Sequence, residues 1–186
     1  MIPIEFQTGK QYDHFQSKEL SIMVNGIANA MTREMISKRD LAEFRRITSF
    51  DNTSQSVRKI INKYIPENAR KEYPDEMNLK SWAAILAGMT RMFPFHHDQN
   101  IAPGTALAKS DFSESRLTGL LRSSGSTFFD SVRGVSIHLA TRNQRLNWVE
   151  FATFILSTNP EKKSKTREKI AIDYYKSWEQ EDCRNE

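Results

Sequence analysis

Hydrophobic residues recur three and four positions apart in almost every segment of this chain, with polar residues between them. The apolar stripes cover, in chain order, residues 20–27, 41–47, 57–65, 82–93, 117–121, 128–139, 148–156 and 170–178. This spacing puts the apolar side chains on one face of an α-helix, and no segment alternates as strands typically do. The pattern predicts an all-α protein, an antiparallel bundle of about eight helices.

Helix-breaking residues separate these stripes and indicate where the chain should turn. Pro66, Pro94 and the pair Asn159-Pro160 each follow a stripe, and proline cannot continue a helix from within. The longest connection follows Pro94. The expected units are one domain over residues 1–186, or two packed halves at 1–94 and 104–186 joined by the loop 95–103.

A block of about twenty residues ending at Arg122 combines a small-residue turn, a helix start and two arginines. Glu114 stands three positions after Asp111, which predicts a capping box and a helix that begins near Phe112. Three leucines at helical spacing then form its buried side and leave Arg116 and Arg122 outside it. Arginines outside a buried stripe are typical of a solvated helix and also of a phosphate-binding surface.

The charge of the chain is concentrated in its central part. The net charge is +4, from 27 lysines and arginines against 23 aspartates and glutamates, and this alone does not indicate a nucleic-acid partner. Residues 105–167, however, hold ten basic and five acidic side chains, whereas residues 168–186 hold three basic and six acidic ones. A concentrated positive region favours a polyanionic partner.

The basic residues are therefore the candidate binding residues. They are Arg45, Arg46, Lys109, Arg116, Arg122, Arg133, Arg142, Lys162, Lys163 and Arg167. Most aromatic residues fall at core positions of the stripes and are not interleaved with these arginines. We therefore expect contacts to the phosphate backbone of a nucleic acid without reading of its bases.

No catalytic or metal-binding pattern emerges from the sequence. Cys183 is the only cysteine, so no intramolecular disulfide can form and no zinc site can rest on paired cysteines. His96 and His97 are adjacent but lack the spacing of helical metal ligands, and we expect them in a solvated loop. Neither a Gly-x-Ser-x-Gly elbow nor a phosphate-binding loop is present. We expect a protein that is not an enzyme, with no metal, cofactor or small-molecule substrate.

The sequence also lacks membrane signals. No apolar run approaches the ~20 residues that span a bilayer, and the N-terminal residues do not resemble a signal peptide. We expect a cytoplasmic protein with no membrane partner.

The order of these features resembles the CasB family, the small subunit of the type I-E CRISPR surveillance complex Cascade. The most specific match comprises Gly104, Ala106-Leu107-Ala108, Ser110, Glu114, Arg116 and Leu120-Leu121-Arg122. Further similarity lies at Phe44-Arg45-Arg46-Ile47, Val132-Arg133 and Leu146-Asn147-Trp148. The resemblance covers roughly residues 40–175.

This resemblance implies an all-helical, non-catalytic subunit that acts in antiviral defence. Two copies would lie side by side and contact the backbone and large subunits of Cascade. They would help to hold the displaced DNA strand and the hybrid of crRNA and target DNA in the R-loop. The matched positions imply phosphate contacts for Arg116, Arg122 and Arg133, with Arg45 and Arg46 as neighbours.

Two other interpretations fit the residues alone. The segments 112–122 and 127–140, joined by a polar turn, suit a helix-turn-helix in a free-standing DNA-binding regulator. Alternatively, the chain is a purely structural helical subunit whose cations meet acidic patches on other proteins.

Overall fold

The computed structural model describes residues 9–47, 55–64 and 75–185, and their only regular elements are helices, which confirms the predicted all-α class. The helices are α1 (Gly9–Thr32), α2 (Lys38–Arg45), α3 (Gln55–Tyr64), α5 (Asp75–Met92), α6 (Pro103–Lys109), α7 (Glu114–Arg122), α8 (Gly125–Thr141), α9 (Trp148–Leu156) and α10 (Pro160–Asn185). None of these helices is long and apolar enough to cross a bilayer.

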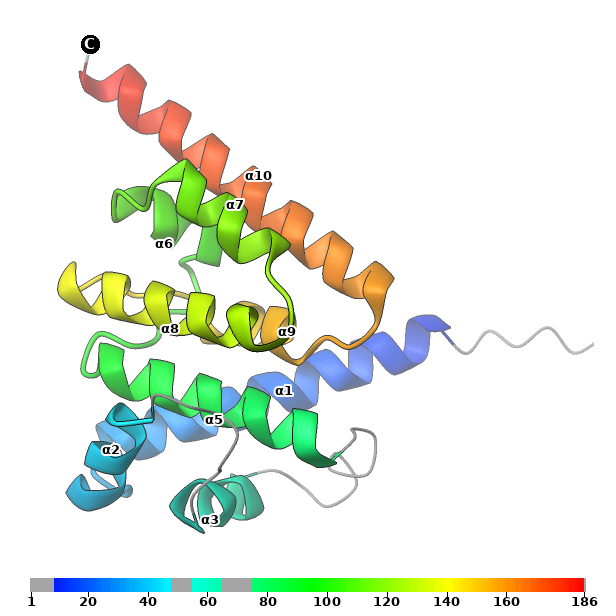
Figure 1. Cartoon of the computed structure of the whole chain (residues 1–186), viewed down its shortest axis with the longest axis vertical. Helices are drawn as coiled ribbons and strands as arrows, with labels where there is room; N and C mark the ends of the chain where they lie inside the picture. The colour runs from blue at the N-terminus through cyan, green and yellow to red at the C-terminus, as the bar shows by residue number, and fades with distance from the viewer. Residues whose placement is uncertain (1–8, 48–54, 65–74, 186) are drawn as a thin grey trace, which may run out of the picture.

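The helices stack in successive layers (Figure 1). Helix α10 packs along α6 at one end of the molecule, with α7 beside them. Helices α8 and α9 form the next layer and pack on α5 and α1, while α2 and α3 cover the far side of α5. The predicted division at the loop 95–103 stays a prediction, although α5 and α1 before this loop pack directly on α8 and α9 after it.

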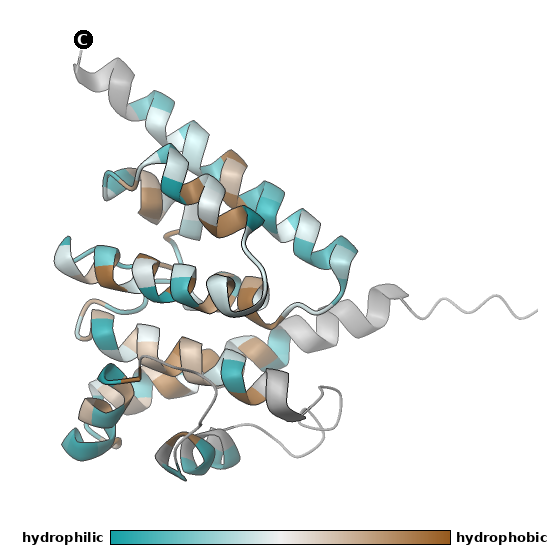
Figure 2. Ribbon diagram, viewed as in Figure 1, coloured by the Kyte–Doolittle hydropathy of each residue, from teal (hydrophilic) through white to brown (hydrophobic). Residues whose placement is uncertain are grey.

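Helix α5 lies at the centre of the bundle. Every residue from 81 to 90 is buried, and its hydrophobic segments are brown in Figure 2, whereas α10 is largely teal. Gly88 allows α9 to approach, because a Cβ at this position would lie only 2.3 Å from Cη2 of Trp148. A central helix with no exposed face explains why the stripe at 82–93 is almost continuously apolar.

The predicted stripes correspond closely to the observed cores of the helices. Met23, Val24 and Ile27 are buried on α1, and the stripes on α8 and α9 are buried as expected. The last stripe is only partly buried, since Ile170 and Tyr174 lie in the core while Trp178 is 37% exposed. The predicted stop at 66 lies outside the described residues.

The capping box predicted before α7 is wrong. Asp111 has a φ of 56° and closes α6 instead: its N–H donates to the carbonyl of Ala108 at 3.0 Å, and the N–H of Phe112 donates to that of Leu107 at 3.1 Å. This pair of bonds is a Schellman motif, which ends a helix at a left-handed residue. The expected small-residue turn is therefore the helix α6, and α7 begins only at Glu114.

The loop between α5 and α6 is also more ordered than its sequence indicates. His96 is only 4% exposed, and its ring nitrogens lie 3.2 and 3.3 Å from the carbonyl oxygens of Pro94 and Ala28. His97 bridges two helices, because its Nε2 lies 2.8 Å from Oδ1 of Asn25 on α1 and its Nδ1 accepts the N–H of Trp148 on α9. The expectation of two solvated histidines is thus wrong, since they fasten the loop to α1 and α9.

These two histidines should make the stability of the fold depend on pH. Burial lowers the pKa of both below the ordinary 6.5, and the positive charge of His96 lowers that of His97 further. The unfolded chain therefore binds protons at a higher pH than the folded chain does, so acid favours unfolding. We expect full stability above about pH 7 and a progressive loss as the pH falls through 6.5 toward the lowered values.

Urea unfolding midpoints measured between about pH 7.5 and 5.5 test this expectation, because few carboxylates titrate in that range. The double variant His96→Phe with His97→Asn should show a much weaker pH dependence than the natural chain. A natural chain whose midpoint stays constant over this range would contradict the assignment.

Candidate nucleic-acid interface

The predicted basic residues fall into three groups in the structure. The His138 cluster comprises Lys109, Asp111, Arg116, His138 and Arg142; the Lys163 cluster comprises Arg122, Lys162, Lys163 and Arg167; the Arg45 cluster comprises Arg45 and Arg46. Arg133, the remaining predicted residue, lies on α8. The sequence identified every lysine and arginine in these groups but not His138. Their role in phosphate binding stays a prediction, and the geometry shows how each side chain is held.

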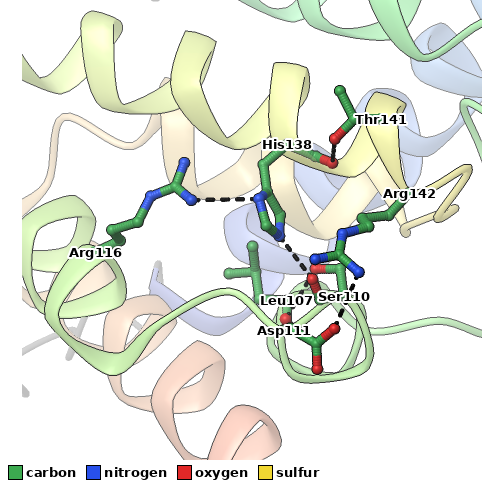
Figure 3. Close-up of polar contacts among 7 residues, drawn as sticks. All are labelled: Leu107, Ser110, Asp111, Arg116, His138, Thr141 and Arg142. Carbon is green, nitrogen blue, oxygen red and sulfur yellow. Dashed lines mark hydrogen bonds and ion pairs between the residues drawn. The ribbon is translucent and has the colours of Figure 1, made fainter.

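The His138 cluster lies where the start of α7 meets the end of α8 (Figure 3). Nη1 of Arg116 lies 3.3 Å from Nδ1 of His138, and Nε2 of His138 lies 2.7 Å from the carbonyl oxygen of Ser110. The guanidinium of Arg116 also lies 4.5 Å from the centre of the Phe112 ring. Arg116 is exposed but restrained, so less conformational entropy is lost when it binds an anion.

The hydrogen bonds around His138 determine which nitrogen carries its proton. Arginine can only donate, so Nδ1 must accept from Arg116, and Nε2–H must donate to the carbonyl of Ser110. In this arrangement His138 orients Arg116 by accepting its hydrogen bond. Its position on α8 relative to Arg116 depends on how α7 folds back, and no local sequence pattern encodes that distance.

Two further cations lie beside His138. Nη1 of Arg142 lies 3.1 Å from Oδ2 of Asp111, and Figure 3 shows this pair facing the link between α6 and α7. Both side chains are more than half exposed, and such pairs contribute less than about 1 kcal/mol. Lys109, the last residue of α6, is exposed nearby in the chain. A phosphate can therefore compete with Asp111 for Arg142.

The Lys163 cluster lies where the turn between α7 and α8 meets the first turns of α10. Nη2 of Arg167 donates to the carbonyl of Ser123 at 3.4 Å, which fixes α10 to this turn. Nζ of Lys163 lies 4.3 Å from the centre of the Phe128 ring, and its pKa is lowered by burial and by the positive charge of Arg167. Arg122 ends α7 at the same turn and is exposed.

Helix α10 begins within this cluster. The Asn159 side chain accepts the N–H groups of Glu161 and Lys162 at 2.9 and 3.1 Å, which caps the helix. Lysines in a first turn face the positive end of the helix dipole, an arrangement that is unfavourable without an anion nearby. Glu161 lies in the same first turn and pairs with Lys165 at 2.7 Å, so this end of α10 carries charges of both signs.

The Arg45 cluster lies at the end of α2. Nε of Arg45 donates to the carbonyl of Thr90 at 3.1 Å, which fixes the end of α2 to the end of α5, and Arg46 is exposed beside it. Arg133 on α8 is only 3.6 Å from Asp130 in a partly exposed ion pair. About a third of the Arg133 side chain is exposed.

The helices that carry most of these basic residues pack against one another in succession. Helix α7 packs on α8, α8 packs on α5 and α5 packs on α2, in the order seen in Figure 1. Because α8 lies between α7 and α5, its apolar face is committed to the core. Recognition helices also bury their apolar face, so sequence-specific binding to a duplex is what tests the helix-turn-helix interpretation. The arrangement suits contacts to phosphates along a strand.

The described residues contain no group of three histidine, cysteine, aspartate or glutamate side chains that could hold a metal ion.

The aromatic residues also have a role that the sequence did not reveal. Phe112 and Phe128 are core residues, yet each also lies against a cation, Arg116 and Lys163 respectively. These contacts position cations and leave backbone contact as the expected mode of binding.

Comparison with known proteins gives a similarity of fold. The sequence matches no family model and no curated protein. The fold matches a chain in the crystal structure of E. coli Cascade bound to a PAM-containing dsDNA target, with a TM-score of 0.64 and 17% sequence identity. The match covers 83% of this chain and 95% of that chain, so the two share a fold over nearly their whole length.

Proposed function

We propose that the chain is a non-catalytic subunit of a type I-E CRISPR Cascade complex and that it stabilises the R-loop through contacts to phosphates. The observation that carries this proposal is the shared fold with a chain of DNA-bound E. coli Cascade, which extends over 95% of that chain. The resemblance of residues 104–122 to the CasB family points to the small subunit.

The exposed cations supply the mechanism. In an R-loop, the hybrid formed is about as stable as the DNA duplex it replaces, so a few protein contacts to phosphates can shift the balance. Arg116 and Arg122 have no carboxylate partner among the described residues. Arg142 pairs with Asp111, and both side chains are more than half exposed, while Arg133 lies 3.6 Å from Asp130 in a partly exposed pair. These four arginines can therefore bind phosphates at little cost to the fold.

The proposed partners are the backbone and large subunits of Cascade, a second copy of this chain, the crRNA and the target DNA. Such a complex would act on DNA in the cytoplasm. The chain would need neither cofactor nor substrate, because positioning of phosphates by fixed charges requires no covalent step.

Assembly with partner subunits tests this proposal. When tagged chain is co-expressed with the other Cascade subunits of its own source and a guide RNA, we expect it to co-purify with them at fixed stoichiometry. The isolated chain should bind nucleic acid weakly and without sequence preference, with a log–log salt slope of roughly −0.7 per phosphate on a single strand.

The alternatives predict different results. A regulator would bind one duplex sequence far more tightly than a scrambled duplex and would purify without Cascade subunits. A purely structural subunit would co-purify but would show no salt-dependent binding to a single strand. Either result would contradict the proposed role.

A further inference from the structure

Helix α10, at the outer edge of the molecule in Figure 1, carries a patch of exposed hydrophobic side chains. Seven large hydrophobic residues are exposed in the part of the chain that the structure describes, and three of them lie close together on α10: Ile172 at 43%, Tyr175 at 43% and Trp178 at 37%. The other four lie singly on different elements. Single exposed hydrophobic residues are ordinary, whereas a contiguous patch marks an interaction surface.

The three side chains share one face of α10. At 3.6 residues per turn, Ile172, Tyr175 and Trp178 fall within an arc of about 120° around the helix axis. The opposite side of the helix packs on α6, where the hydroxyl of Ser177 donates to Oγ1 of Thr105 at 3.0 Å. The arc is therefore turned away from α6, and we call it the outer face of α10.

Contacts within the chain hold the aromatic side chains of this face in place. The ring of the buried Tyr174 stacks on that of Trp178, with centroids 5.7 Å apart, and meets the ring of Tyr175 edge-on at 5.3 Å. The hydroxyl of Tyr175 donates to Oε1 of Glu114 on α7 at 2.7 Å. Side chains that are restrained before binding lose less conformational entropy when a partner covers them.

Carboxylates border the outer face of α10. Glu168 and Glu179 are exposed and fall within the same arc, and Glu114 adds a third carboxylate from α7. Lys169 and Lys176, the basic residues of this stretch, fall outside the arc. The carboxylates would repel the phosphates of a nucleic acid, and also an anionic lipid surface, which attracts basic residues. This face therefore suits a protein that presents lysines or arginines around apolar side chains.

We propose that the outer face of α10 docks a basic surface of a partner protein, with Tyr175 and Trp178 as its anchors. Tyrosine and tryptophan dominate the energetic centres of protein interfaces, because they bury a large apolar area and carry a polar group for the rim. The carboxylates form the rim and select a partner of opposite charge. This inference rests on the proposed function, in which the chain joins other subunits, and it separates the docking surface from the basic clusters.

Removal of the two anchors tests the docking surface. The probe is the set of other Cascade subunits from the chain's own source, assembled on a guide RNA without this chain. The double variant Tyr175→Ser with Trp178→Ser should bind this probe at least about tenfold more weakly than the natural chain, as expected for truncated interface anchors. The control Ile22→Ser removes an exposed apolar side chain from α1 and should bind like the natural chain. Equal affinities for all three chains would overturn the inference.

A charge reversal tests the choice of a basic partner and leaves the aromatic packing in place. Glu179→Lys should associate more slowly with the same probe and with a weaker dependence on salt, because charges at a rim act mainly on the rate of encounter. Glu34→Lys, in the turn between α1 and α2, should do neither. A Glu179→Lys chain that associates as fast as the natural chain, or faster, would overturn the inference.

Two measurements on the isolated chain separate the other possible occupants of this face. We expect the anchor double variant to sediment like the natural chain and to bind single-stranded oligothymidylate with the same salt slope. A natural dimer that the variant dissociates would show that the face binds a second copy, and lost strand binding would show that it binds nucleic acid; either result would overturn the inference. A natural chain that fails to bind the Cascade probe would instead contradict the proposed function on which the inference rests.

Discussion

Replacement of Gly104 by alanine is expected to lower the free energy of unfolding by about 3 kcal/mol or more. Gly104 lies in the first turn of α6, where α6 packs along α10. A Cβ there would lie 2.1 Å from the carbonyl oxygen of Ile170 and 2.6 Å from the backbone nitrogen of Tyr174. These are backbone atoms of a helix, so they cannot move aside as a flexible side chain could. The two helices would have to separate along their whole contact.

The matched control is Gly119→Ala in the middle of α7. A Cβ at this position meets no atom within 4 Å, and alanine is the better helix former. We therefore expect a gain of roughly 0.5–1 kcal/mol, opposite in sign to the effect at Gly104. Thermal and urea unfolding of both variants measures the difference. A Gly104→Ala chain as stable as the natural one would show that α6 and α10 do not pack as closely as described.

The prediction at Gly104 also concerns function, because α10 carries part of the candidate interface. The packing of α6 on α10 places Lys163 and Arg167 beside the turn that follows Arg122. If the two helices separate, the Lys163 cluster should lose its geometry together with the stability of the fold.

The periodic stripes predicted the helices well because a stripe and its helix depend on the same 3.6-residue repeat. The stripe from Trp82 to Phe93, for example, became the central helix α5. Helix ends were less predictable. Asp111 followed by Glu114 has the residues of a capping box, but the left-handed backbone at Asp111 closes α6 instead. The two uses of an aspartate differ in backbone conformation, which composition does not reveal.

The sequence predicted which basic residues belong to the candidate site, but it did not predict how they are arranged in space. Arg116 and Arg122 could be identified because they fall outside an apolar stripe. The support that His138 gives to Arg116 depends on a contact between two helices, over 22 positions of the sequence. The burial of His96 has the same origin, since its partner Ala28 lies 68 positions away.

Reversal of the charge at both α7 arginines, in the double variant Arg116→Glu with Arg122→Glu, is expected to destabilise the R-loop strongly. Each change removes an exposed cation and adds an anion that repels phosphates. A cost of about 0.7–1.4 kcal/mol at each position would together shorten the lifetime of the R-loop by roughly tenfold to a hundredfold. The salt slope should fall by about 1.4, because each phosphate that an arginine neutralises on a single strand adds roughly 0.7 to it.

A control for this double variant must change the net charge equally at a distance from the interface. Lys18 on α1 and Lys176 on α10 are exposed and lie outside all three clusters. The double variant Lys18→Glu with Lys176→Glu should therefore keep the natural lifetime. Melting temperatures of both double variants would show that the fold is retained.

The rate at which target DNA dissociates from assembled Cascade, measured at two salt concentrations, tests the central claim most directly. Complexes with the natural chain and with the control variant should hold the R-loop equally long. Complexes with Arg116→Glu and Arg122→Glu should release it at least tenfold faster and with a weaker dependence on salt. Equal lifetimes for all three complexes would contradict the proposal that this chain stabilises the R-loop through its exposed arginines.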